Sequence, residues 1–196
     1  MAKLHQIVAE INTRLTQAGG QFDSKKFQKG RFSGIAELIT KVDKKEIRQT
    51  IPAIIDNSGD ETKLTIDDSY PFELYHRHLT STVTEIEADF GDRVIREETA
   101  NMVLVVMGDR QRLKLNKEDI ITGINLGMPV ELGSAFLTAN SLVGANIIQG
   151  EFNLNKEEVW NSEFNTEVGT KPSDILFSLS YQVVTKTWTT CIEICE

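Results

Sequence analysis

The sequence predicts an α+β fold, in which a mainly antiparallel sheet with a long β-hairpin is packed by an N-terminal amphipathic helix and a second short helix. Residues 3–18 carry apolar side chains at helical spacing. Residues 72–107 contain two long extended segments around a short turn, which is typical of a hairpin. Residues 173–196 contain neither glycine nor proline and begin with a period-two alternation of apolar side chains.

The size and charge of the chain fit one soluble domain. Its 196 residues can bury a real core, and we expect a single domain over residues 1–196. The net charge of −8 argues against non-specific nucleic-acid binding, for which a basic surface supplies the affinity. The N-terminus lacks the apolar core of a signal peptide, and the longest apolar run, Met102 to Met107, is too short to span a bilayer. We therefore expect a cytoplasmic protein with no membrane segment.

The first helix is predicted over residues 3–18. Its apolar side chains recur three or four positions apart, so they form one stripe that can pack on a sheet face. Gly19 and Gly20 stand where a helix commonly ends. The stripe consists of Leu4, Ile7, Val8, Ile11 and Leu15.

Two strands are predicted next, over residues 32–42 and 46–56, around a polar turn at residues 43–45, and residues 35–42 are also compatible with a short helix. Pro52 has no backbone N–H, so we expect the second strand to be an edge or bulged strand. A shorter strand is predicted over residues 63–66.

The hairpin is predicted to pair residues 72–90 with residues 94–107. The end of its second strand, Met102 to Met107, is apolar on both faces, which predicts a strand covered on both sides. In its first strand, the alternation separates two sets of side chains. One face carries Thr80, Thr82, Thr84, Ile86, Ala88 and Phe90, and the other carries Val83, Glu85, Glu87 and Asp89.

A second helix is predicted over residues 116–127. Asn116 is a favourable N-cap, and Glu118 and Asp119 lie in the first turn, where the helix dipole favours anions. The stripe of this helix is formed by Ile120, Ile121 and Ile124. Beyond it, residues 130–141 are expected to be irregular or a short strand, residues 145–154 to be a strand kinked at Gly150, and residues 157–164 are ambiguous.

The C-terminal segment changes its pattern halfway. From Ile175 to Val183 the odd-numbered side chains are apolar in strict alternation. Beyond this point the apolar side chains fall at even-numbered positions instead, at Val184, Trp188 and Ile192. A β-bulge near Val184 would produce this change, because an extra residue turns the following side chains to the other face. We therefore predict a core strand over residues 174–183 and an extension over residues 185–195 that serves an interface or a partner's sheet.

Few residues suggest chemistry. His76 and His78 have the spacing of two zinc ligands on one strand face, but a third ligand at recognisable spacing is absent from the sequence. The sequence also lacks nucleophile motifs and phosphate-binding glycine loops. Cys191 and Cys195 are expected to be reduced thiols. We expect no enzymatic activity, no cofactor and no metal, and a metal-dependent hydrolase at the two histidines is the least favoured alternative.

Acidic residues of the hairpin suggest an interface instead. Glu85, Glu87 and Asp89 line one strand face at steps of about 7 Å. Such carboxylates discourage edge aggregation or face a basic partner. The interface candidates are Glu85, Glu87, Asp89, Glu97, Glu98 and Trp188.

The order of these elements resembles that of the tail terminator and tail-completion proteins of tailed bacteriophages and prophages, which are small α+β proteins. Three stretches carry the resemblance: the helix stripe from Leu4 to Leu15, the run Met102 to Met107, and the ending Leu179 to Val184 within a Tyr-x-Val-Val-x-x-x-Trp pattern. The resemblance covers most of the chain and depends on layout. This chain is longer than is usual in the group, and the extra length is expected in residues 128–172.

The resemblance implies a non-enzymatic virion structural protein that forms a homo-oligomeric ring at the head–tail junction. Such a subunit contacts other tail or connector proteins, assembles in the host cytoplasm, and binds neither a specific nucleic acid nor a membrane. An acidic inner surface would repel phosphates and let DNA pass. The alternative is a small-ligand-binding module in which the sheet curls around an apolar pocket under the helices.

Overall fold

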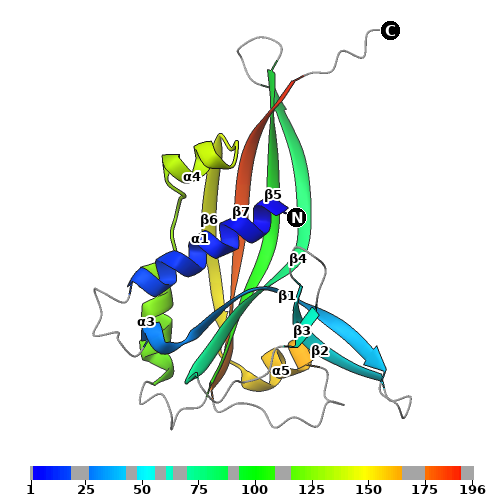
Figure 1. Ribbon diagram of the computed structural model, residues 1–196, viewed down its shortest axis with the longest axis vertical. Coiled ribbons are helices and arrows are strands. Elements are labelled where there is room, and N and C mark those ends of the chain that lie inside the picture. The colour runs from blue at the N-terminus through cyan, green and yellow to red at the C-terminus, as the bar shows by residue number, and fades with distance from the viewer. Residues whose placement is uncertain are drawn as a thin grey trace.

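The computed structural model describes residues 2–18, 27–42, 48–55, 61–63, 70–87, 93–108, 116–164 and 175–190. Within them, seven strands form one sheet in the order β3-β2-β1-β4-β5-β7-β6 (Figure 1). Neighbouring strands are antiparallel except β1 and β4, which are parallel, so the predicted α+β fold with a mainly antiparallel sheet is confirmed. The strands are β1 (Arg31–Val42), β2 (Arg48–Ile55), β3 (Glu61–Lys63), β4 (Phe72–Glu87), β5 (Arg93–Gly108), β6 (Gly144–Asn153) and β7 (Ile175–Thr190).

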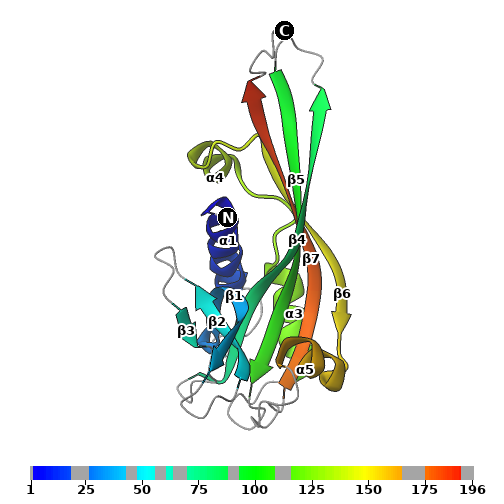
Figure 2. The same ribbon diagram turned by 90° about the vertical axis from the view of Figure 1, so that its right-hand side faces the viewer.

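Helices lie on both faces of the sheet (Figure 2). The predicted N-terminal helix is α1 (Ala2–Ala18), which packs beside α3 (Lys117–Gly127) on what we call the helix face. On the opposite face, the far face, α5 (Lys156–Phe164) contacts β7 and β2. This helix occupies the segment that the sequence left ambiguous. Two short elements are η1 (Phe27–Lys29) and α4 (Ser134–Ala139), and α4 forms where an irregular segment or a short strand was expected.

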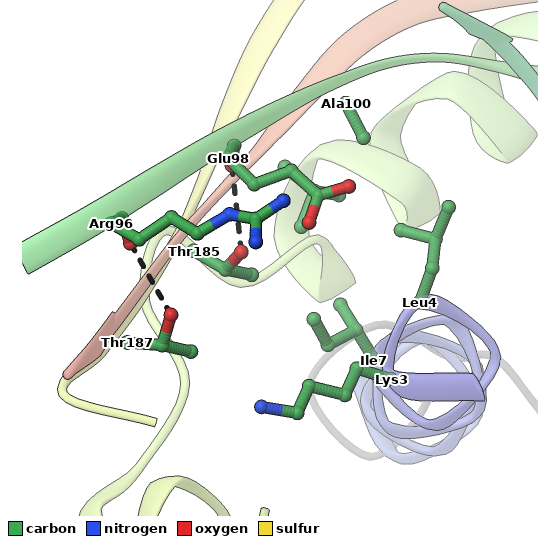
Figure 3. Close-up of a pocket in the computed structure, with 9 residues that line it drawn as sticks. Lys3, Leu4, Ile7, Arg96, Glu98, Ala100, Thr185 and Thr187 are labelled. Carbon is green, nitrogen blue, oxygen red and sulfur yellow. Dashed lines mark hydrogen bonds between the residues drawn. The ribbon is translucent and has the colours of Figure 1, made fainter. Parts of the chain in front are cut away.

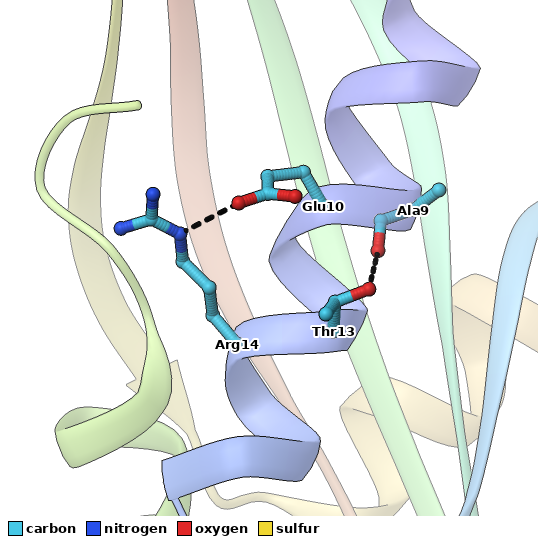
Figure 4. A network of polar contacts seen from close by, with 4 residues as sticks. All are labelled: Ala9, Glu10, Thr13 and Arg14. Carbon is cyan, nitrogen blue, oxygen red and sulfur yellow. Dashed lines mark hydrogen bonds and ion pairs between the residues drawn. The ribbon is translucent and has the colours of Figure 1, made fainter. Parts of the chain in front are cut away.

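The apolar stripe holds α1 on the sheet. Ile7, Val8, Ile11 and Leu15 are buried, and Leu4 packs against the same core. The polar side of the helix carries an ion pair of 2.9 Å between Arg14 and Glu10, and the Thr13 hydroxyl donates to the Ala9 carbonyl (Figure 4). Exposed pairs of this kind contribute about 0.3–0.5 kcal/mol, whereas each buried aliphatic side chain contributes about 1.5–3 kcal/mol. The buried stripe therefore contributes more to the attachment of α1 to the sheet than the exposed polar pairs do.

The second helix begins as predicted. The Asn116 side chain accepts from the backbone N–H of Asp119 at 2.8 Å, and the Asp119 carboxylate accepts from the backbone N–H of Asn116 at 3.1 Å. This capping box satisfies two backbone donors that a helix end leaves open. Ile120 and Ile124 are buried below the cap, and Ile121 packs partly against them.

The lower part of β5 is covered on both sides, as its sequence predicted. Met102, Leu104 and Val106 belong to the helix-face core, which α1 and α3 close. Val105 and Met107 belong to the far-face core, together with Val159 of α5 and Leu176 of β7. Alternate side chains of one strand thus enter two separate cores.

The long hairpin is confirmed, and it contains a bulge that the sequence did not predict. β4 and β5 pair from Phe72 opposite Gly108 to Glu87 opposite Val94, with a register shift between His78 and Thr80. The even-numbered side chains before the shift point to the helix face, and those after it point to the far face, as the hydrogen bond from Asn101 to Thr80 illustrates. The predicted separation of the Thr80 set from the Val83 set is confirmed for the described side chains from Thr80 to Ile86, and the members at residues 88–90 lie outside the described residues.

The predicted bulge near Val184 is wrong. β7 pairs with β5 without interruption from Ile175 opposite Gly108 to Thr190 opposite Arg93, and Val184 lies opposite Thr99. The pattern changes because the cover ends: Tyr181 and Val183 are buried on the helix face, whereas Thr185 and Thr187 continue that face where it becomes accessible. The described part of the extension, residues 185–190, thus pairs within its own sheet, and residues 191–195 lie outside the described residues.

The kink predicted at Gly150 is confirmed. The pairing of β6 with β7 shifts register between Gln149 and Phe152. A Cβ on Gly150 would lie 2.4 Å from the Ser180 Oγ and 3.0 Å from the Ser180 carbonyl oxygen, so only glycine permits this close approach.

The expectation that Pro52 marks a bulge is wrong, and β2 as a whole is not an edge strand, although its described pairing with β3 covers only Ala53 to Ile55. β2 has β1 on one side and β3 on the other, and Pro52 stands in regular register opposite Leu38. The third strand of this group, β3, ends its described part at Lys63, so the predicted strand over residues 63–66 falls mostly outside the described residues.

Candidate functional site

The most distinctive surface is the projecting end of the sheet formed by β4, β5 and β7, which β6 borders as far as Gly144, opposite Lys186 (Figures 1 and 2). We call residues 80–87, 93–101 and 182–190 the blade. On β4, every side chain described from Thr80 to Ile86 is exposed, whereas every side chain from Phe72 to His76 is buried. On β5 and β7 many side chains of the blade are half-buried, and Ala100 and Val183 are buried, so the most open part of the blade lies along β4.

An apolar row crosses the far face of the blade. Ile86 lies opposite Ile95, and Ile95 lies opposite Trp188, so the three side chains are neighbours on three adjacent strands. Ile86 is 40% exposed and Trp188 is 49% exposed. Exposed apolar side chains that gather in this way mark interaction surfaces, and tryptophan is enriched in them.

The predicted interface residues divide between the two faces. Glu85 and Glu98 lie on the helix face, with Glu85 opposite Arg96, whereas Glu97 and Trp188 lie on the far face. The Glu97 carboxylate is 3.2 Å from the Lys186 ammonium. Glu87 pairs through its backbone with Val94, but its side chain and all of Asp89 lie outside the described residues. The described carboxylates are thus interleaved with cations and do not form one acidic face.

A groove lies where the N-terminal end of α1 meets the helix face of the blade (Figure 3). Its volume is about 250 Å³. The side chains of Arg96 and Glu98 project from β5 towards α1, and Lys3 extends from the helix into the same space. The apolar lining is Leu4, Ile7, Ala100 and Val183, and the polar lining is Lys3, Arg96, Glu98, Thr185 and Thr187. No sequence pattern indicated this groove, because its cations come from segments that only the fold brings together.

A buried polar chain lies deeper under α1. The His76 ring is fully buried, with Nδ1 2.6 Å from the Tyr181 hydroxyl and Nε2 2.9 Å from the Asn12 side-chain oxygen. Because an amide oxygen only accepts, Nε2 carries the proton, and the hydroxyl donates to Nδ1. Asn12 in turn donates to the Ser33 carbonyl at 2.9 Å. Burial lowers the pKa of His76 to about 3 and raises the pKa of Tyr181 above its usual value.

These contacts bear on the histidine pair considered as a metal site. Both ring nitrogens of His76 are occupied by protein groups, while His78 bonds the Ser81 hydroxyl at 2.8 Å on the exposed side of the bulge. Within the described residues, no group of three or more histidine, cysteine or acidic side chains is placed to hold a metal ion. The geometry of His76 therefore suits a structural role.

Replacing Tyr181 with phenylalanine should lower the free energy of unfolding by about 1–2 kcal/mol, because the buried Nδ1 of His76 would lose its donor. Urea unfolding at pH 7.5 measures the change. Tyr70→Phe is the matched control, since Tyr70 is 39% exposed, and it should change stability by only a few tenths of a kcal/mol. Equal effects of the two variants would contradict the assigned hydrogen bond.

Comparison of the chain with models of protein families and with curated protein sequences finds no match. Of the described helices, none is long and apolar enough to cross a membrane.

Proposed function

We propose that this chain is a non-enzymatic structural subunit that assembles with copies of itself through the blade. The observation that supports this proposal best is the apolar row Ile86, Ile95 and Trp188 on the far face of the blade, in which Ile86 and Trp188 are exposed and Ile95 is half-buried. Burying such a row between subunits would supply hydrophobic free energy at the place where the monomer has least.

We further propose that the assembly is a ring at the head–tail junction of a tailed phage or prophage. The layout that suggested this family is present: an N-terminal helix on an antiparallel sheet, a second helix after a strand buried on both faces, and a long last strand. A ring requires two different surfaces that meet head to tail between copies. The partners of such a ring are other tail or connector proteins, and its place is the virion.

The alternatives have less support from the site. A metal-dependent hydrolase would need the ring nitrogens of His76, which Tyr181 and Asn12 occupy. A small-ligand-binding module would need a pocket of about 300–1,000 Å³, and the groove of about 250 Å³ falls below that range.

Solution mass and imaging test the proposal directly. Light scattering across a concentration series should show a mass several times the 22.0 kDa of one chain, and negative-stain images should show closed rings. A mass of one chain at the highest concentrations would contradict self-assembly. Open filaments would support the proposed self-assembly but contradict the proposed ring.

Replacing Trp188 with lysine should weaken this assembly at least about tenfold, because buried tryptophans commonly contribute 2 kcal/mol or more at interfaces. The concentration at which half of the mass dissociates measures the change. Val130→Lys is the matched control, since Val130 is 79% exposed and lies outside the blade. A Trp188→Lys chain that assembles like the control would show that the apolar row is not the contact.

A further inference from the structure

The outer edge of the blade, along β4, is open in the described part of the chain. β4 lies between β1 and β5 in the sheet, but β1 pairs with it only as far as Ile35, opposite His76, and then diverges to pair with β2. β5, by contrast, pairs with β4 as far as Glu87 (Figure 1). From Thr80 to Ile86 the described residues therefore give β4 a neighbouring strand on one side only, and every side chain of this stretch is exposed.

An open edge of this length is a template for another extended strand, because its outer backbone N–H and C=O groups can continue the ladder. We call residues 80–86 the edge run. Five of its seven residues are β-branched, which favours strand pairing. Lysine and proline, which commonly block such edges, do not occur in it, and Glu85 carries its single charge.

Glu85 restricts which strand can pair with the edge run. Parallel stacking of two copies in register would place Glu85 beside its own copy, and like charges directly opposite destabilise a sheet. Antiparallel pairing of two copies instead has a two-fold axis perpendicular to the sheet, so the same face of both copies lies on one side. Only an axis beside Val83, the middle residue, pairs the whole edge run with itself.

This antiparallel register makes the opposing side chains complementary. On the helix face, Val83 meets Val83 of the second copy, and the Glu85 carboxylate meets Ser81, whose hydroxyl can donate to it. On the far face every opposing pair is β-branched: Thr82 with Thr84, and Thr80 with Ile86. Cross-strand pairs of these kinds stabilise sheets, so the edge run fits a second copy of itself.

We propose that the edge run of β4 pairs antiparallel with the edge run of a second copy, about a two-fold axis beside Val83. The two blades then form one continuous sheet of six strands, with both far faces on the same side. This proposal rests on the proposed self-assembly and goes beyond it by naming a contact and its register. The contact joins two copies and does not include Ile95 or Trp188, so it adds to the head-to-tail contact that a ring requires.

Cysteine cross-linking tests the position of the axis. In a chain with Cys191→Ser and Cys195→Ser, Val83→Cys should form a disulfide between copies on mild oxidation, because Cα atoms of directly opposing residues lie about 4.5–5.5 Å apart. Thr84→Cys is the matched control, since this neighbouring side chain is equally exposed. Its two copies would be offset by two residues and lie about 8 Å apart, which is too far to bridge.

A charge at position 81 tests the register independently. Ser81→Lys would face Glu85 of the second copy and should tighten the association about threefold or more, whereas Ser81→Glu should weaken it by a similar factor. Both variants lose the same contact of 2.8 Å between Ser81 and His78, so this loss cannot explain opposite effects. Val130→Lys and Val130→Glu change the net charge equally at a site outside the blade and correct for general repulsion. Light scattering across a concentration series measures all four.

The outcomes separate this proposal from the proposed function. A chain that assembles, but shows neither the Val83→Cys cross-link nor opposite effects at position 81, would overturn the edge pairing and leave self-assembly standing. A cross-link through Thr84→Cys in place of Val83→Cys would overturn the axis beside Val83. An unaltered chain that keeps the mass of one chain, 22.0 kDa, at the highest concentrations would overturn both proposals.

Discussion

At pH 4.5 the folded chain should be about 2 kcal/mol less stable than at pH 6.5 through His76 alone. Burial lowers the pKa of this histidine from 6.5 to about 3, so the unfolded chain binds a proton throughout this range and the folded chain does not. Each pH unit below 6.5 then costs about 1.4 kcal/mol of stability until the pKa of the folded state is approached. At pH 6.5 half of the unfolded chains still hold the proton, and about one pH unit higher neither state holds it, so this dependence vanishes.

Urea unfolding from pH 8 to pH 4 measures the slope, and a His76→Gln variant isolates it from the carboxylates that titrate in the same range. Glutamine keeps an amide donor for Asn12 but has no proton to gain. The variant will be less stable at pH 8, since its fit to Tyr181 is poorer, and its stability should fall less steeply between pH 6.5 and 4. Parallel curves for the two chains would show that His76 protonates in the folded state as readily as in the unfolded state.

The histidine illustrates where inference from the sequence stops. Asn12 and Tyr181 lie 64 and 105 residues from His76 along the chain, and Tyr181 meets it across the intervening strand β5. Nothing in the local pattern of any of the three residues indicates the others. The spacing of His76 and His78 suggested at most two ligands on one face, whereas the fold buries one ring and leaves the other at the exposed bulge.

Sequence patterns that depend on burial predicted the fold correctly. The stripe of α1 and the double-sided apolar run of β5 predicted which faces are covered, because burial selects apolar side chains wherever cover exists. At Val184 the pattern changed because the cover ends, and a change of parity alone cannot distinguish that from a bulge. The sequence does not indicate the bulge in β4, because both faces of this strand are exposed in the blade. Without a buried face, no alternation of apolar side chains shows where the side chains change face.

Replacing Gly108 with alanine should lower the free energy of unfolding by about 3 kcal/mol. The new Cβ would lie 2.7 Å from the Phe72 Cβ, 2.9 Å from the Pro71 carbonyl oxygen and 3.1 Å from the Phe72 Cα. Two of these atoms are backbone, and Phe72 is fully buried, so the clash cannot be relieved by turning a flexible side chain. The start of β4 would have to move away from the end of β5, which loosens the core beneath α1 and α3.

The matched control is Gly144→Ala at the start of β6, where the nearest atom to a new Cβ is the Lys186 Cδ at 4.0 Å. Both substitutions reduce the conformational freedom of the unfolded chain by a similar amount, which by itself favours folding by about 0.4–1 kcal/mol. Gly144→Ala should therefore be neutral or slightly stabilising in urea unfolding, so the difference between the variants measures the clash at Gly108. A difference below about 1 kcal/mol would mean that β4 and β5 yield at this pair, and that the packing of Phe72 does not fix where the hairpin begins.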